Sequence, residues 1–259
     1  MLYLLGSDRT TSLATDNDAN FMHYTELGWE CTVGRLWLVH NLCQGKIGPS
    51  DEVVTLKDRM FMYSKLCKVR AFSPDLQGFA VSPFDYGTFL SDLHVANGVF
   101  VPWRWPEEIP KILDFDFEPV DPTPCIVINH RVRNHSADRN FSKEQTRDLV
   151  TVAISLGLKP YICGRYAESV DARAEYIPRL QTVASLIHHP NCRAFVASGG
   201  PSLMAQQCCR NKLVFINTCG NLNNFHPLYL SPYLNFSGCR TIVVPPNHPP
   251  AVTEAILAD

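Results

Sequence analysis

Short apolar runs alternate with helix-like segments along residues 125–259, and this alternation limits the folds open to the chain more than any other feature. The runs are "CIVINHRV", "KPYICGR", "CRAFVAS", "KLVFIN" and "RTIVVP". The segments between them have helical patterns. In "SKEQTRDLVTVAISLG", for example, Ser142 and Gln145 stand at capping-box spacing and Gly157 ends the pattern. Strands that alternate with helices predict a parallel sheet of the α/β class.

The first half of the chain shows the same alternation less regularly. "MLYLLGSD", "DEVVTLKDR", "KVRAF" and "GVFVPW" predict strands, and residues 19–42 and 60–67 predict helices. The segment between the halves carries five prolines and six acidic residues, a composition that excludes a helix interior or a central strand. We therefore expect an N-terminal α/β lobe at 1–104, a linker at 105–124 and a C-terminal α/β lobe at 125–259.

Composition excludes several classes of partner. Hydrophobic residues make up 46% of the chain and charged residues 19%, which is enough for a buried core. The net charge of -2 gives no overall attraction to nucleic acid, and no apolar window is long enough for a membrane span. The ten cysteines form no CxxC pair and no export signal is evident, so we expect reduced thiols and a cytoplasmic protein.

The stretch "SGGPSLMAQQCC" predicts a turn from a strand into a helix. Gly199 and Gly200 follow the apolar run, Pro201 suits the first turn of a helix, and Ser202 adds a hydroxyl beside free N–H groups. An open helix N-terminus at the carboxyl end of a parallel strand is a phosphate site. The alternative is an ordinary tight turn between strand and helix.

Basic residues follow two other predicted strands. Arg131, Arg133 and Arg139 follow "CIVIN", and Gly164 and Arg165 follow "KPYIC". Guanidinium groups bind phosphate through two parallel hydrogen bonds, although a solvated basic loop has the same composition. In a parallel sheet all three strand ends share one edge, which predicts a site for a diphosphate-bearing ligand.

Residues 125–230 resemble the C-terminal, donor-binding lobe of GT-B fold glycosyltransferases, most closely those of the heptosyltransferase type. Ser198, Gly199, Gly200, Pro201, Leu203 and Ala205 match the family's motif at this turn, and His226 with Pro227 matches a downstream loop. The chain is short for the fold, and Ser198 stands where many relatives have an acid.

The resemblance implies two Rossmann-like lobes with parallel sheets and a cleft between them. It also implies a donor-binding set in the C-terminal lobe: Arg131, Arg133, Arg139, Gly164, Arg165, Ser198, Gly199, Gly200, Pro201, Ser202, Leu203 and His226.

The implied activity is transfer of a hexose or pentose from a UDP- or GDP-type nucleotide sugar to a glycan hydroxyl, with inversion. A carboxylate must then deprotonate the acceptor hydroxyl. Asp8 is the leading candidate because the family keeps its base in the first loop. Asp16 and Asp18 are rivals that would also serve as helix caps.

A metal is not expected, because "DFD" at 114–116, the nearest thing to an Asp-x-Asp run that holds a metal and a diphosphate, lies in the predicted linker, and no cofactor is implied. The alternatives are a non-catalytic module that binds a nucleotide or phosphosugar, and a nucleotide-sugar epimerase of the same build. The sequence leaves the sugar, the nucleotide and the acceptor open.

Overall fold

The computed structural model describes residues 2–4, 27, 30–73, 93–96, 99–102, 115–132, 140–164, 166–216, 237–245 and 250–258. The chain forms two compact units, Met1–Asp116 and Phe117–Asp259. The division falls inside the Pro-rich segment 105–124, whose described part, 115–124, contains no helix or strand. The bounds of the lobes and the linker given above stay predictions.

Unit 2 is built on a six-stranded sheet in which every neighbouring pair is parallel, in the order β11-β10-β9-β6-β7-β8. This confirms the predicted parallel α/β architecture. The strands are β6 (Cys125–Asn129), β7 (Lys159–Cys163), β8 (Glu175–Ile177), β9 (Cys192–Ala197), β10 (Lys212–Ile216) and β11 (Arg240–Val244).

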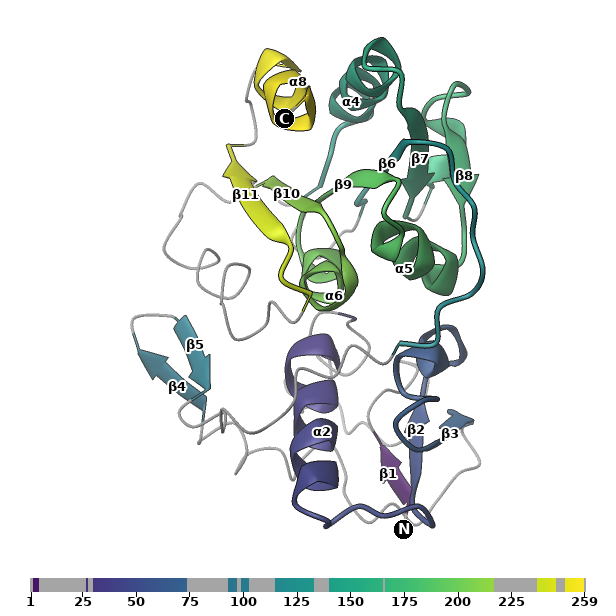
Figure 1. Cartoon of the computed structure of the whole chain (residues 1–259), viewed down its shortest axis with the longest axis vertical. Helices are drawn as coiled ribbons and strands as arrows, with labels where there is room; N and C mark the ends of the chain where they lie inside the picture. The colour runs from purple at the N-terminus through teal and green to yellow at the C-terminus, as the bar shows by residue number, and fades with distance from the viewer. Residues whose placement is uncertain are drawn as a thin grey trace, which may run out of the picture. The chain divides into compact units, whose positions relative to one another are not determined.

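Helices cover both faces of this sheet, as Figure 1 shows. One face carries α4 (Lys143–Ser155) and α8 (Pro250–Ala258), and the other carries α5 (Leu180–His188) and α6 (Gly200–Cys208). A short 3₁₀ turn, η6 (Ala167–Ser169), follows β7. Strands covered on both sides read as nearly continuous apolar runs, which is why the sequence of this half is so regular.

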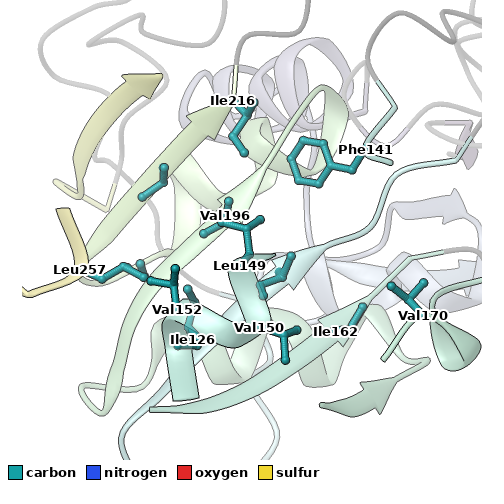
Figure 2. Packing of buried hydrophobic residues seen from close by; sticks show 14 of the residues in the cluster. Ile126, Phe141, Leu149, Val150, Val152, Ile162, Val170, Val196, Ile216 and Leu257 are labelled. Atoms are coloured by element: carbon teal, nitrogen blue, oxygen red, sulfur yellow. The ribbon is translucent and has the colours of Figure 1, made fainter. Parts of the chain in front are cut away.

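The main core lies between the sheet and the α4 face. In Figure 2, Leu149, Val150 and Val152 of α4 lie over the sheet, and Leu257 of α8 packs into the same cluster. The strands supply β-branched residues such as Ile126, Ile162, Val196 and Ile216, which fit a pleated surface.

The predicted capping box fixes the start of α4. The Ser142 hydroxyl accepts a hydrogen bond from the Gln145 backbone N–H (3.1 Å), and the Gln145 side chain accepts one from the Ser142 backbone N–H (2.8 Å). Gly157, with a φ of 69°, lies just beyond the helix and confirms the predicted end.

Unit 1 contains a three-stranded parallel sheet in the order β1-β2-β3 and a separate antiparallel hairpin, β4-β5. The hairpin departs from the predicted all-parallel pattern. The predicted helix at 60–67 is wrong: a 3₁₀ turn ends at Met62 and turns follow. The elements are β1 (Leu2–Leu4), η2 (a π-helical turn, Glu30–Gly34), α2 (Arg35–Cys43), β2 (Glu52–Thr55), η3 (Lys57–Met62), β3 (Lys68–Ala71), β4 (Leu93–Ala96) and β5 (Val99–Pro102).

A buried carboxylate ties together three elements of unit 1. Glu30, fully buried in η2, accepts hydrogen bonds from the Thr55 hydroxyl, from Tyr63 (2.9 Å) and from the Arg59 guanidinium (2.6 Å). Burial raises the pKa of the Tyr63 hydroxyl, so Tyr63 stays protonated and donates. This network could not be predicted from local sequence patterns, because its members are far apart in the chain.

Among the described residues, no helix is long and apolar enough to cross a membrane, and no cysteine forms a disulfide.

Candidate functional site

The ends of β9, β6 and β7 lie next to one another at one edge of the unit 2 sheet. β6 is central: it pairs with β7 on one side and with β9 on the other. The chain runs outward from β6 to β7 and β8, then returns to β9, so the strand order reverses between β6 and β9. Open α/β sheets bind ligands outside the carboxyl ends of their strands at this kind of reversal.

Arg131 and Gly199 meet at that reversal. The Arg131 Nε atom lies 3.3 Å from the position that a Cβ on Gly199 would occupy. Gly199 has a φ of 73° and a ψ of -148°, which only glycine adopts without strain. A guanidinium group therefore lies directly against the turn that leads into α6.

The position of Arg131 is fixed by its neighbours. Its Nη1 atom donates to the Asn140 side-chain oxygen at 2.7 Å, and its carbonyl accepts from the Phe141 N–H at 3.1 Å. The residue is only 8% exposed. A charged group held in this way loses little entropy on binding an anion.

Gly164 brings the ends of β6 and β7 close together. It has a φ of 116°, and a Cβ there would lie 2.3 Å from the His130 carbonyl oxygen. The His130 N–H donates to the Cys163 carbonyl at 2.8 Å, which extends the strand pairing by one residue. Glycine is thus required at position 164 because the backbones at the ends of β6 and β7 approach each other closely. This geometric role is separate from the donor-binding role predicted for Gly164.

The N-terminus of α6 carries no side-chain cap. The Ser202 N–H donates to the Gly199 carbonyl at 3.0 Å, whereas the buried Ser202 hydroxyl has no hydrogen-bond partner among the described residues. The helix dipole favours an anion at this end. Arg131, against Gly199, adds a full positive charge beside it.

The other residues predicted to bind the donor at this turn differ in how deeply they are buried. Ser198 and Leu203 are buried, and Pro201 is half-buried in the first turn of α6. Leu203 thus has the burial of a packing residue.

Two polar residues at the end of β6 were not singled out in the sequence. Asn129 is the last residue of β6 and donates to the Cys163 sulfur at 3.6 Å. His130 follows it, with Nδ1 2.8 Å from the Thr146 hydroxyl. Their position directly after the apolar run "CIVI" was the sequence feature that could have marked them as residues of a strand end.

The surroundings of His130 disfavour the charged form of its ring. The Thr146 hydroxyl donates to the Ser142 carbonyl at 3.1 Å, so it accepts from Nδ1–H of His130. Burial, and then the charge of Lys143, lower the pKa of His130 below its usual 6.5. The ring is therefore less charged near neutral pH than a free histidine side chain.

Several predicted residues lie outside the described part of the chain: Asp8, Asp16, Asp18, Arg133, Arg139, Arg165 and His226. Among the residues that are described, no cluster of His, Cys, Asp or Glu is arranged to hold a metal ion.

No protein-family model matches this sequence, and no curated protein matches it. Solved structures do match. ADP-heptose LPS heptosyltransferase II of E. coli aligns with a TM-score of 0.57 at 11% identity, over 99% of this chain and 98% of that one. The chain has the heptosyltransferase fold. E. coli heptosyltransferase WaaC with ADP aligns with a TM-score of 0.53, again at 11% identity and over 99% and 98% of the two chains.

The predicted resemblance to heptosyltransferases is thereby confirmed for the fold, over nearly the whole chain. At this identity the alignment carries no residue roles.

Proposed function

We propose that this protein is a glycosyltransferase of the two-lobed GT-B arrangement, which transfers a sugar from a nucleoside diphosphate to a carbohydrate hydroxyl. The observation that carries the proposal is the contact of Arg131 with Gly199 at the uncapped start of α6. A diphosphate bound there would lie at the positive end of the helix dipole, beside the Arg131 guanidinium.

The donor nucleotide to test first is ADP. One matched enzyme is an ADP-heptose transferase and the other was solved with ADP, so nothing favours the UDP- or GDP-type donor expected from the sequence. The candidate donor sugars likewise include heptoses, in addition to the hexoses and pentoses expected from the sequence.

The proposed chemistry is an inverting displacement. A carboxylate removes the proton of the acceptor hydroxyl while its oxygen attacks the anomeric carbon, and the bond from that carbon to the diphosphate breaks. Asp8 is the proposed base, with Asp16 and Asp18 as rivals. Arg131 and the N-terminus of α6 stabilise the charge that develops on the leaving diphosphate.

The test is calorimetric titration of ADP into Arg131→Ala and Arg131→Lys. Loss of a charge-assisted hydrogen bond should weaken binding by about tenfold or more in Arg131→Ala. Arg131→Lys keeps the charge but loses the planar fork, so its affinity should be intermediate. Arg193→Ala, which removes an exposed arginine of β9, is the control and should bind as the wild type does.

Unchanged affinity in Arg131→Ala would remove the diphosphate assignment. An assay of donor turnover distinguishes a transferase from an epimerase and from a binding module. A transferase slowly releases sugar to water, an epimerase changes the stereochemistry of the sugar without releasing nucleotide, and a binding module does neither.

A further inference from the structure

Four cysteines lie at the amino edge of the unit 2 sheet, opposite the edge that carries the proposed diphosphate site. Cys125 and Cys192 are the first residues of β6 and β9, whereas Cys209 precedes β10 and Cys239 precedes β11. Because these strands are parallel neighbours, their amino ends share one edge. The cysteines form two pairs, each joined by a hydrogen bond between its thiols: Cys125 with Cys192, and Cys209 with Cys239. Each pair thus brings two sulfur atoms into contact.

Backbone hydrogen bonds fix the place of Cys239 beside the end of α6. The Ser237 N–H and hydroxyl both donate to the Gln206 carbonyl in the last turn of α6, at 3.1 and 3.0 Å. The residue after Cys239 donates its N–H to the Asn211 carbonyl at 3.0 Å, where β11 begins to pair with β10. The chain therefore enters β11 against the C-terminal end of α6, where Cys209 is the capping residue (Figure 1).

The two pairs differ in how freely their backbones can adjust. Cys125 and Cys192 are register partners on neighbouring strands, so a covalent bond between them would have to shift a strand of the core. Cys209 follows a helix and Cys239 precedes a strand, so both lie just outside regular elements. A disulfide tolerates only a narrow range of distances and dihedral angles. The pair at 209 and 239 is therefore the better placed to form one.

The Cys239 sulfur is the stronger nucleophile of its pair. The hydrogen bond with Cys209 lowers the pKa of the Cys239 thiol to about 7, although burial opposes this effect. The same hydrogen bond, and then burial, raise the pKa of the Cys209 thiol. The Thr241 hydroxyl also lies 3.9 Å from the Cys239 sulfur. Because the thiolate is the form that attacks an oxidant, Cys239 reacts first and Cys209 second.

We propose that Cys209 and Cys239 are a dithiol site that hydrogen peroxide oxidises to a disulfide. The Cys239 thiolate attacks one peroxide oxygen, so that a sulfenic acid forms and hydroxide leaves, taking up the proton that Cys239 released. The Cys209 thiol then attacks the sulfenic sulfur, the S–S bond forms and water leaves. The two thiols lose two electrons, and one peroxide becomes two molecules of water. The oxidant must be small, because Cys209 and Cys239 are only 1% and 3% exposed.

The test is mass spectrometry of the full chain after treatment with about one equivalent of hydrogen peroxide. Remaining thiols are alkylated, and the protein is digested with trypsin without a reductant. A disulfide between peptides 194–210 and 213–240 is expected. Cys239→Ser should abolish this link. Cys209→Ser should instead accumulate the sulfenic acid of Cys239, which dimedone traps as a stable adduct.

The double variant Cys208→Ser with Cys219→Ser is the matched control. Both residues lie in the same two tryptic peptides as the proposed pair, so their removal leaves one possible link between these peptides. Cys208 is as deeply buried as Cys209, and a serine there can keep its hydrogen bond to the Met204 carbonyl. The double variant should form the disulfide as the wild type does.

The link should also raise the melting temperature, because it closes residues 210–238 into a loop and so restricts the unfolded chain. A rise of about 5 °C or more is expected for a chain of this size. Thermal unfolding of the oxidised and reduced proteins measures it. Cys239→Ser, treated with peroxide in the same way, should show no rise.

Three results would overturn the proposal. The first is that both thiols remain open to alkylation after peroxide treatment. The second is that the link persists in Cys239→Ser, or that oxidation is confined to Cys125 and Cys192. The third is a melting temperature that does not rise on oxidation, since the native backbone would then not accommodate the bond. None of these measurements involves a nucleotide, so the proposed function is tested separately.

Discussion

At the scale of single residues, unit 1 contains a charged pair that is withdrawn from water. Arg59 and Glu30 are both buried, with Nη1 and Oε2 2.6 Å apart, whereas exposed Arg70 pairs with half-buried Glu52 at 2.9 Å. An ion taken out of water must be paired, because the protein interior does not replace its hydration. The two pairs should therefore respond very differently to loss of the arginine.

Arg59→Met should destabilise the protein by about 3–5 kcal/mol, because the Glu30 carboxylate is then buried without its counter-ion. Arg70→Met, the matched control, should cost no more than about 1 kcal/mol. The double variant Arg59→Met with Glu30→Gln should recover part of the loss. Urea unfolding measures all three, and equal losses in the two single variants would contradict the explanation.

At the scale of elements, the His130–Thr146 hydrogen bond ties the end of β6 to α4. Because the folded state lowers the pKa of His130, the unfolded chain binds more protons than the native chain near pH 6.5 and below. The stabilisation that depends on neutral His130 is therefore complete above this range and is lost as the pH falls.

The free energy of unfolding should accordingly decrease from pH 7 to pH 5, with His130 contributing at most about 1.4 kcal/mol per pH unit. His130→Gln should make this decrease less steep. Urea unfolding at pH 8, 7, 6 and 5 measures both proteins, and parallel curves would exclude His130 as a source of the acid sensitivity.

Elements with strong local signals were predicted, and those that depend on distant partners were not. The capping box of Ser142 and Gln145 predicted α4, and the apolar runs predicted the five longer strands of unit 2. Strand β8, "EYI", was missed because it is short, lies at an edge and pairs only with β7.

The same limit applies to the site. Glycines and arginines at strand ends could be recognised in the sequence, because their backbone freedom and charge are properties of the residue itself. The hydrogen bonds of Asn129 with Cys163 and of His130 with Thr146 join residues that are neighbours only in the folded chain. Pairwise contacts of this kind leave no local pattern.

At the scale of the whole molecule, the proposed transfer uses protein charges alone. Arg131 and the N-terminus of α6 supply the positive charge at the diphosphate. We expect donor hydrolysis and transfer to continue at an undiminished rate in excess EDTA. Loss of activity in EDTA with recovery on addition of manganese would show that a metal takes part.

The pairing of β6 with β9 has a consequence for how the protein is made. Arg131 and Gly199 come from distant parts of the chain, and they meet only after the intervening strands and helices have been laid down beside β6. A chain that ends before α6 would therefore lack one side of the proposed diphosphate site. If the completed fold binds a nucleotide sugar as proposed, a high concentration of that ligand should also protect the protein from unfolding.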